Sequence, residues 1–315
     1  MKQLIKRFLQ KIPYIRSLHQ QVATLQQQVA TLHQQVEKEG MYPAGHYHSP
    51  IPDGDDVLAY IKSRRAPTPA LLDVRLNKEC QFSLLADYFQ FYKDLPFPEK
   101  QSQDYRYYYD NQWYCYTDAI FLYSFLRKHL PKRIVEIGSG FSSAVMLDTV
   151  DGFFSNRPEI TFIEPYPDRL RSLLRGDDER HVKLIDRKLQ EVPLELFSSL
   201  EAGDFLFIDS SHIVKCGSDL QLLMFEILPL LQPGVFVHFH DVFYPFDYPS
   251  QWLKEGWYWN ENYFLRAFLA YNSEWSIYFY NTYVAFAFND FLKDKMPLCT
   301  KDSGGSLYIL REKMG

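Results

Sequence analysis

The feature that most constrains the fold is an alternation of short apolar segments with helical segments along residues 118–315. The apolar segments are rich in β-branched and aromatic residues, and they lie at 133–138, 159–165, 181–186, 203–211 and 233–241. Strands that are apolar on both faces and alternate with helices are typical of a parallel sheet covered by helices on both sides. Two later segments, 275–280 and 306–311, also predict strands. The sequence therefore predicts an α/β fold with a doubly wound, seven-stranded sheet.

Three regions follow from this pattern. Residues 1–40 hold a basic amphipathic segment and a heptad repeat, residues 41–117 form a helical and aromatic cap region, and residues 118–315 form the sheet domain. A helix at 117–130 leads into the sheet, and Thr117 is a suitable N-cap for it. With 315 residues, of which 46% are hydrophobic, the chain is long enough to bury a large core.

Charge and cysteine content exclude several classes of protein. The net charge of −5 gives no basic field that would attract nucleic acid. The four cysteines have no C-x-x-C spacing, which indicates reduced thiols in a cytoplasmic protein. The sequence has no signal-peptide pattern and no apolar run of about 18 residues, so we expect neither a leader nor a transmembrane helix.

A heptad repeat occupies residues 18–36. Its leucines (Leu18, Leu25, Leu32) alternate with valines (Val22, Val29, Val36) at steps of four and three residues. Valine at position a and leucine at position d favour two parallel helices. The flanking e and g positions hold glutamine and histidine, so no salt bridge selects the partner. We therefore expect a coiled coil that supports a homodimer.

The segment before the repeat, residues 1–16, is basic and contains no acid. Its apolar residues recur at helical spacing, and Pro13 should separate this helix from the next. A basic amphipathic helix suits peripheral contact with an anionic membrane surface. The alternative is a short helix that simply leads into the coil.

A glycine turn follows the first predicted strand, in "VEIGSGFSS". Gly138 and Gly140 would allow a ligand to approach the backbone at a helix N-terminus. A dinucleotide fingerprint would have glycine at 143, where this chain has Ser143. Glu164 ends the next strand, where a carboxylate can accept the hydroxyls of a ribose. Glu136 would repel a pyrophosphate but could receive an ammonium group, which favours a methionyl cofactor.

These motifs resemble the class I S-adenosylmethionine-dependent methyltransferases, and in particular the bacterial methyltransferase domain 24 type. The resemblance rests on "VEIGSGFSSAVMLD", "FIEP", "DFLFIDSSH", "GSDLQLLMFEILPLLQPGVFVHFHD" and "GGSLYILR", and it covers roughly residues 118–311. It implies a Rossmann-like seven-stranded sheet with an antiparallel last strand. It also implies S-adenosylmethionine as the cofactor, bound by the following residues: Glu136, Gly138, Ser139, Gly140, Glu164, Asp186 and Asp209. Beside the adenine, the choice between Asp186 and Gln190 stays open.

Polar residues follow the fourth and fifth predicted strands. Asp209 and His212 come after the fourth, and His240 and Asp241 end the fifth. Ligands of open parallel sheets bind outside the carboxyl ends of the strands, so these side chains should meet at the active edge. His238 lies in mid-strand, and we expect it to be a core histidine with satisfied hydrogen bonds.

Three roles for this polar group stay open. His212 or His240 could act as a general base toward an acceptor hydroxyl, assisted by Asp241. Asp209, His240 and Asp241 could instead hold magnesium or manganese, although a histidine at position 240 departs from the acid or amide that is usual in the family. The acids could also merely cap helices or orient backbone amides.

The sequence as a whole predicts O-methylation of a small hydroxylated acceptor, either sugar-like or phenolic. Three other functions remain open at this stage: an NAD-linked oxidoreductase, a metal-dependent hydrolase that uses the histidines, and a non-catalytic assembly protein.

Overall fold

The computed structural model describes residues 13–38, 41–68 and 70–312. The chain divides into two compact units. The smaller unit combines Met1–Arg64 with Gln251–Tyr258, and the larger unit combines Arg65–Ser250 with Trp259–Gly315. The predicted boundary after residue 117 falls inside the larger unit, because residues 65–117 group with the sheet.

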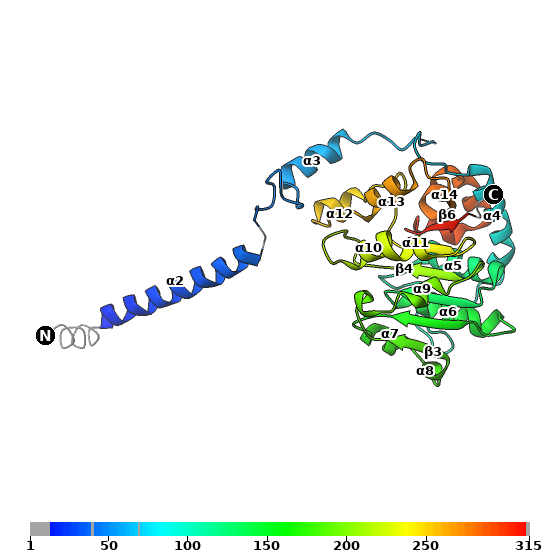
Figure 1. The fold of residues 1–315 in the computed structure, drawn as a ribbon, viewed down its shortest axis with the longest axis horizontal. Helices are drawn as coiled ribbons and strands as arrows, with labels where there is room; N and C mark the ends of the chain where they lie inside the picture. Colours follow the sequence, from blue (N-terminus) through cyan, green and yellow to red (C-terminus); the bar gives the residue numbers. More distant parts are fainter. Residues whose placement is uncertain (1–12, 39–40, 69, 313–315) are drawn as a thin grey trace. The chain divides into compact units, whose positions relative to one another are not determined.

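The larger unit is built on a seven-stranded sheet (Figure 1). The strands are β1 Arg133–Ile137, β2 Glu159–Ile163, β3 Val182–Ile185, β4 Phe205–Ile208, β5 Phe236–Phe239, β6 Trp275–Tyr280 and β7 Leu307–Arg311. They lie in the order β3-β2-β1-β4-β5-β7-β6. The first five pair in parallel, whereas β7 is antiparallel to both β5 and β6. The doubly wound fold with an antiparallel last strand is thereby confirmed.

Helices precede and connect the strands of the larger unit. They are α4 Lys78–Tyr92, α5 Tyr116–His129, α6 Phe141–Phe153, α7 Asp168–Leu173, α8 Asp178–His181, α9 Glu195–Ser198, α10 Asp219–Leu222, α11 Leu228–Leu230, α13 Glu261–Leu269, α14 Asn281–Ala287 and α15 Asn289–Lys295, with 3₁₀ turns η1 Leu189–Glu191 and η3 Pro297–Thr300. A π-helical turn, η2 Leu223–Ile227, joins α10 to α11. The segment between β4 and β5 is therefore largely helical, with one widened turn.

Side chains on the two faces of the sheet enter two different hydrophobic clusters. Phe205 and Phe207 of β4 pack with residues of α4, α5 and α6. Leu206 and Ile208 of the same strand pack with residues of η2, α11 and α13. Successive side chains of a strand point to opposite faces, so a strand that is apolar throughout needs helices on both. This arrangement leaves only the strand ends for polar chemistry.

The N-terminus of α5 differs from the prediction. The helix begins at Tyr116 with Cys115 as the N-cap residue, so the expected cap at Thr117 is wrong. The Thr117 hydroxyl instead donates to the backbone carbonyl oxygens of Cys299 (3.1 Å) and Asp302 (3.0 Å). Both partners are remote in sequence, and a local helix-start pattern carries no information about them.

The smaller unit contains α2 Pro13–Lys38, α3 Gly54–Ser63 and most of α12 Ser250–Lys254. Asp53 caps α3 by accepting hydrogen bonds from the backbone N–H groups of Asp55 and Asp56. The basic amphipathic segment predicted for residues 1–16 falls mostly outside the described residues, which begin at 13. Among the helices of the described ranges, none has the length and apolar character needed to cross a membrane.

Candidate active site

The glycine turn after β1 is fixed by Gly138. Its φ is +78°, a left-handed conformation that side chains with a Cβ rarely adopt. A Cβ added there would lie 1.9 Å from the carbonyl oxygen of Asp209. Gly140 is less constrained, because its φ of 178° is ordinary extended backbone. A Cβ added there would lie 3.2 Å from its nearest neighbour, the Cδ atom of the flexible Arg169 side chain. Gly138 is thus the position that requires glycine.

A pocket of about 500 Å³ lies beside this turn. Its lining includes Ile137, Gly138, Ile163, Glu164, Leu189, Gln190 and Asp209. The Glu164 carboxylate accepts hydrogen bonds from the backbone N–H groups of Ser139 (3.1 Å) and Tyr166 (2.8 Å), which hold it at the pocket wall. The apolar and polar lining together suits a nucleoside-bearing ligand.

Asp186 and Gln190, the two residues considered for the adenine position, differ in their location. Gln190 lines the pocket. Asp186 is outside the described pocket lining, and its exposed carboxylate lies 3.6 Å from Arg171. Of the two residues, only Gln190 is part of this lining, and a contact of either with the adenine stays a prediction.

Glu136 is buried and lies outside the described pocket lining. Its carboxyl oxygens accept hydrogen bonds from the hydroxyls of Ser142 (2.6 Å) and Ser143. Burial raises the pKa of Glu136 to about 8, against the opposing effect of those hydroxyls. The expected contact between Glu136 and an ammonium group stays a prediction; in the structure the carboxyl is engaged by the two serine hydroxyls. The local sequence does carry the relevant signal, in the two serines that open α6.

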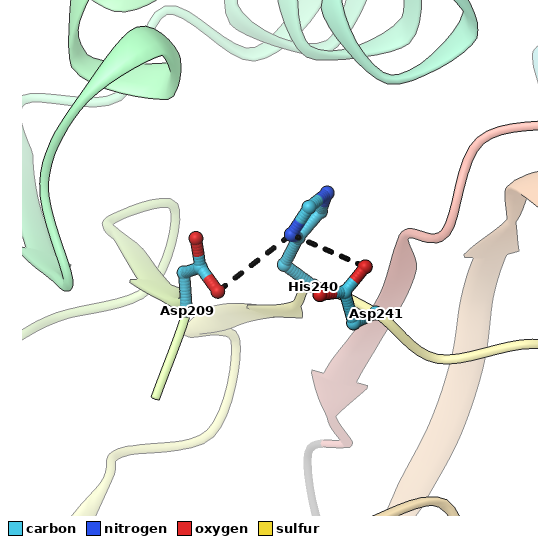
Figure 2. Close-up of side chains that lie close together, drawn as sticks. All are labelled: Asp209, His240 and Asp241. Atoms are coloured by element: carbon cyan, nitrogen blue, oxygen red, sulfur yellow. Dashed lines mark ion pairs between the residues drawn. The ribbon is translucent and has the colours of Figure 1, made fainter. Parts of the chain in front are cut away.

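Asp209, His240 and Asp241 meet at the carboxyl ends of the neighbouring strands β4 and β5, as predicted (Figure 2). His240 Nδ1 lies 3.6 Å from Asp209 Oδ1 and 3.7 Å from Asp241 Oδ1. One donor atom from each residue lies within 4.8 Å of the other two. His240 Nδ1 is buried and has no hydrogen-bond partner among the described residues. This geometry leaves a nitrogen and two carboxylate oxygens facing one point.

Asp118, near the start of α5, lies next to the second ring nitrogen of His240. Its Oδ2 lies 3.5 Å from His240 Nε2. Its carboxylate also accepts hydrogen bonds from Asn281 Nδ2 (2.8 Å), Ser306 Oγ (2.6 Å) and the backbone N–H of Gly305 (2.9 Å). Burial alone would raise the pKa of Asp118, but His240 and these donors outweigh it and lower the pKa. Sequence reasoning missed this residue, which looks there like an ordinary acid in the first turn of a helix.

His212 is held by a second buried acid, Glu261 of α13. His212 Nδ1 lies 2.7 Å from Glu261 Oε2, and Nε2 faces Asp209 at 3.3 Å and Asp241 at 3.6 Å. The Trp259 ring stacks on the imidazole, with centroids 4.2 Å apart. Burial lowers the pKa of His212, but the bonds to Asp209 and Glu261 outweigh it and raise the pKa to about 10. The imidazole is therefore oriented and positively charged at neutral pH.

Backbone conformation also marks this group of residues. His212 and Asp241 both have positive φ, at 60° and 58°. Residues other than glycine adopt this region at a cost, and such residues concentrate at functional sites.

His238 is a core residue, as predicted, but its hydrogen bonds are not satisfied. Its ring stacks on Phe207 with centroids 3.9 Å apart. Neither ring nitrogen has a hydrogen-bond partner in the described part of the chain. Burial holds the pKa of His238 well below its usual value, so the ring is neutral. The expectation of a satisfied histidine is wrong, because the neighbouring strands offer apolar and aromatic side chains in place of hydrogen-bonding groups.

A family of methyltransferase domains matches residues 135–242 of this chain. An uncharacterised protein of Archaeoglobus fulgidus is 35% identical over 166 residues, which cover 51% of this chain and 74% of that protein. Solved structures that align with the chain include an SAH-bound methyltransferase of Podospora anserina, with 15% identity and a TM-score of 0.41 over 87% of this chain and 99% of that one. Another is the O-methyltransferase TomG of Streptomyces achromogenes in complex with SAM, with 18% identity and a TM-score of 0.40 over 82% of this chain and 96% of that one.

The chain belongs to the class I S-adenosylmethionine-dependent methyltransferases, in the methyltransferase domain family that it matches. The enzyme class and the cofactor predicted from the sequence are confirmed. This assignment selects a methyltransferase over the oxidoreductase, the hydrolase and the assembly protein. The pocket suits the cofactor, because Gly138 leaves room at the turn and Glu164 offers a carboxylate to ribose hydroxyls.

Proposed function

We propose that this methyltransferase transfers the methyl group to a hydroxyl oxygen of a small sugar-like or phenolic acceptor, with a divalent cation held by Asp209, His240 and Asp241. The observation that carries the proposal is the buried Nδ1 of His240, which lacks a hydrogen bond yet faces two carboxylate oxygens at 3.6 and 3.7 Å. Those separations are too long for hydrogen bonds. They suit ligands that share one ion.

The charge of the residues around His212 and His240 supports the presence of a bound cation. Four acids gather around two imidazoles: Asp118, Asp209, Asp241 and Glu261. A nitrogen that binds a metal carries no proton, so with His240 neutral, His212 protonated and every acid ionised, three negative charges remain. Uncompensated charge in a buried group is costly, and a divalent ion would neutralise most of it. Carboxylate ligands favour magnesium or manganese, and the imidazole nitrogen is compatible with manganese.

When bound, the cation would lower the pKa of the acceptor hydroxyl and so favour the oxyanion that attacks the methyl group. The chain's own residues supply orientation. Asp118 faces Nε2 of His240, which leaves Nδ1 toward the carboxylates. Glu261 and Trp259 fix the ring of His212 beside the same carboxylates. Gly138 and Glu164 would position the methyl donor at the adjacent pocket.

A general base is the second candidate, and the bond of His212 to Glu261 favours it, because an oriented imidazole is a common proton acceptor. The charge state opposes it. The pKa of His212 is raised to about 10, and that of His240 is also raised, by the charges of Asp241 and Asp209, despite burial. An imidazole that is already protonated cannot accept the proton of the acceptor.

The two candidates predict different results in one experiment. We would follow methyl transfer from labelled S-adenosylmethionine to a panel of phenolic and sugar hydroxyls, with and without exhaustive chelation. The cation proposal predicts that chelation abolishes turnover and that manganese or magnesium restores it. It also predicts that Asp241→Asn loses manganese binding in calorimetry but keeps S-adenosylhomocysteine binding. Asp290→Asn, a change at an exposed acid of α15, is the matched control and should bind both ligands normally.

A general base would give the opposite pattern. Turnover would ignore chelators, and His212→Ala would slow transfer by about 10²–10⁴-fold. Activity that survives both chelation and His212→Ala would show that the polar group is architectural. Methylation confined to amines would contradict the proposed hydroxyl acceptor.

A further inference from the structure

Helix α2 presents an uncovered apolar seam. Leu18, Val22, Leu25 and Val29 lie along it with exposed fractions of 41%, 50%, 58% and 51%. Large apolar side chains exposed in a continuous row are unusual for a soluble surface, and they mark interaction sites. The helix spans 26 residues, so it is about 39 Å long, which is ample for an interface along its axis.

The spacing along the seam identifies the geometry of the partner. The apolar residues recur at alternating steps of four and three, and this period keeps them facing a second helix only in a left-handed coiled coil. Valine occupies every a position and leucine every d position of the repeat. This combination favours two parallel strands over three or four.

The flanking residues identify the partner as another copy of the same chain. Gln21, Gln26 and Gln28 at the e and g positions are uncharged, so two identical helices meet without repulsion. A different partner helix is normally selected by complementary charges at these positions, and this seam offers none. On the polar face, the hydroxyls of Thr24 and Thr31 are satisfied within the helix by the carbonyl oxygens of Gln20 (3.0 Å) and Gln27 (2.9 Å).

We propose that α2 pairs with α2 of a second copy as a parallel two-stranded coiled coil, which makes the enzyme a homodimer. The seam shares no residue with the methyl-transfer site, so variants in the seam leave the residues of that site unchanged. The proposal does not rest on the identity of the acceptor or on the cation.

Two double variants test the proposal in the full-length chain. Leu25→Glu with Val29→Glu places two like charges in the seam of each helix. Ala23→Glu with Gln27→Glu adds the same charges, at the same four-residue spacing, to exposed positions outside the seam. We expect sedimentation of the unaltered chain and of the control pair to give twice the chain mass of 37.3 kDa, and the seam pair to give a single chain mass. Both variants should bind S-adenosylhomocysteine as the unaltered chain does, which shows that the larger unit remains folded.

The orientation of the helices has its own test. In a parallel coil each residue meets its own counterpart, so oxidised Val22→Cys should form a covalent dimer above the background of the unsubstituted chain. A monomeric unaltered chain, a trimeric or tetrameric mass, or a seam variant that stays dimeric would each overturn the proposal. A dimer in which Val22→Cys does not crosslink would overturn the parallel arrangement.

Discussion

Replacing Gly138 by alanine tests the geometry of the cofactor turn. Two costs can be worked out from the structure. A left-handed conformation at φ +78° costs a residue with a Cβ about 1–2 kcal/mol. The new Cβ would lie 1.9 Å from the Asp209 carbonyl oxygen, so the backbone of one strand end must move, and relief of such overpacking costs about 1–3 kcal/mol. The free energy of unfolding should therefore fall by about 2–5 kcal/mol.

The same displacement should weaken cofactor binding, because Gly138, Glu164 and Asp209 all line the pocket. We would measure the free energy of unfolding in urea and the affinity for S-adenosylhomocysteine by calorimetry. Gly140→Ala is the matched control. Its φ of 178° is extended and its new Cβ would meet only the Cδ and Cγ atoms of the Arg169 side chain, at 3.2 and 4.0 Å, so the stability of the variant should change by less than about 0.5 kcal/mol. Equal losses in the two variants would refute the reasoning.

Two further predictions concern buried acids. The pKa of Glu136 is raised from its ordinary value of 4.5 to about 8 in the folded protein. Its neutral form therefore contributes stability that is fully present below pH 4.5 and is lost as the pH rises to 8. The free energy of unfolding should fall by up to about 5 kcal/mol across this window. Glu136→Gln stays neutral, so the free energy of unfolding of this variant, measured by urea titration, should fall less across this pH window. A pH profile parallel to that of the unaltered protein would contradict the assigned pKa. Asp118→Asn removes the charge that faces His240 and should weaken manganese binding about 10- to 100-fold in calorimetry; an unchanged affinity would show that Asp118 does not position the ring.

Much of the fold could be predicted because its determinants are local. Each strand of the parallel part is an apolar run such as Phe205–Ile208, and its burial on both faces follows directly from that composition. The meeting of Asp209 with His240 and Asp241 was also predictable, because neighbouring parallel strands end at one edge. Topology alone brings these residues together, and the prediction needed no side-chain detail.

The residues that the sequence did not reveal act through distant contacts. Asp118 gains its role from Asn281 and Ser306, which lie more than a hundred residues away. The bond of Glu261 to His212 likewise depends on how α13 packs. The choice of Gly138 over Gly140 depended on a backbone angle and a carbonyl position, and no motif contains either.

The smaller unit is discontinuous in sequence, and this limits how the protein can be cut or recombined. Gln251–Tyr258 belongs to the same unit as Met1–Arg64, although five of the larger unit's seven strands lie between them in the chain. A fragment that begins at Arg65 would keep the second stretch and lose the first. A fragment that begins at Met41 would remove the coil and retain residues 41–64 of the first stretch together with the second. Exchange of this unit between relatives would likewise require two simultaneous grafts.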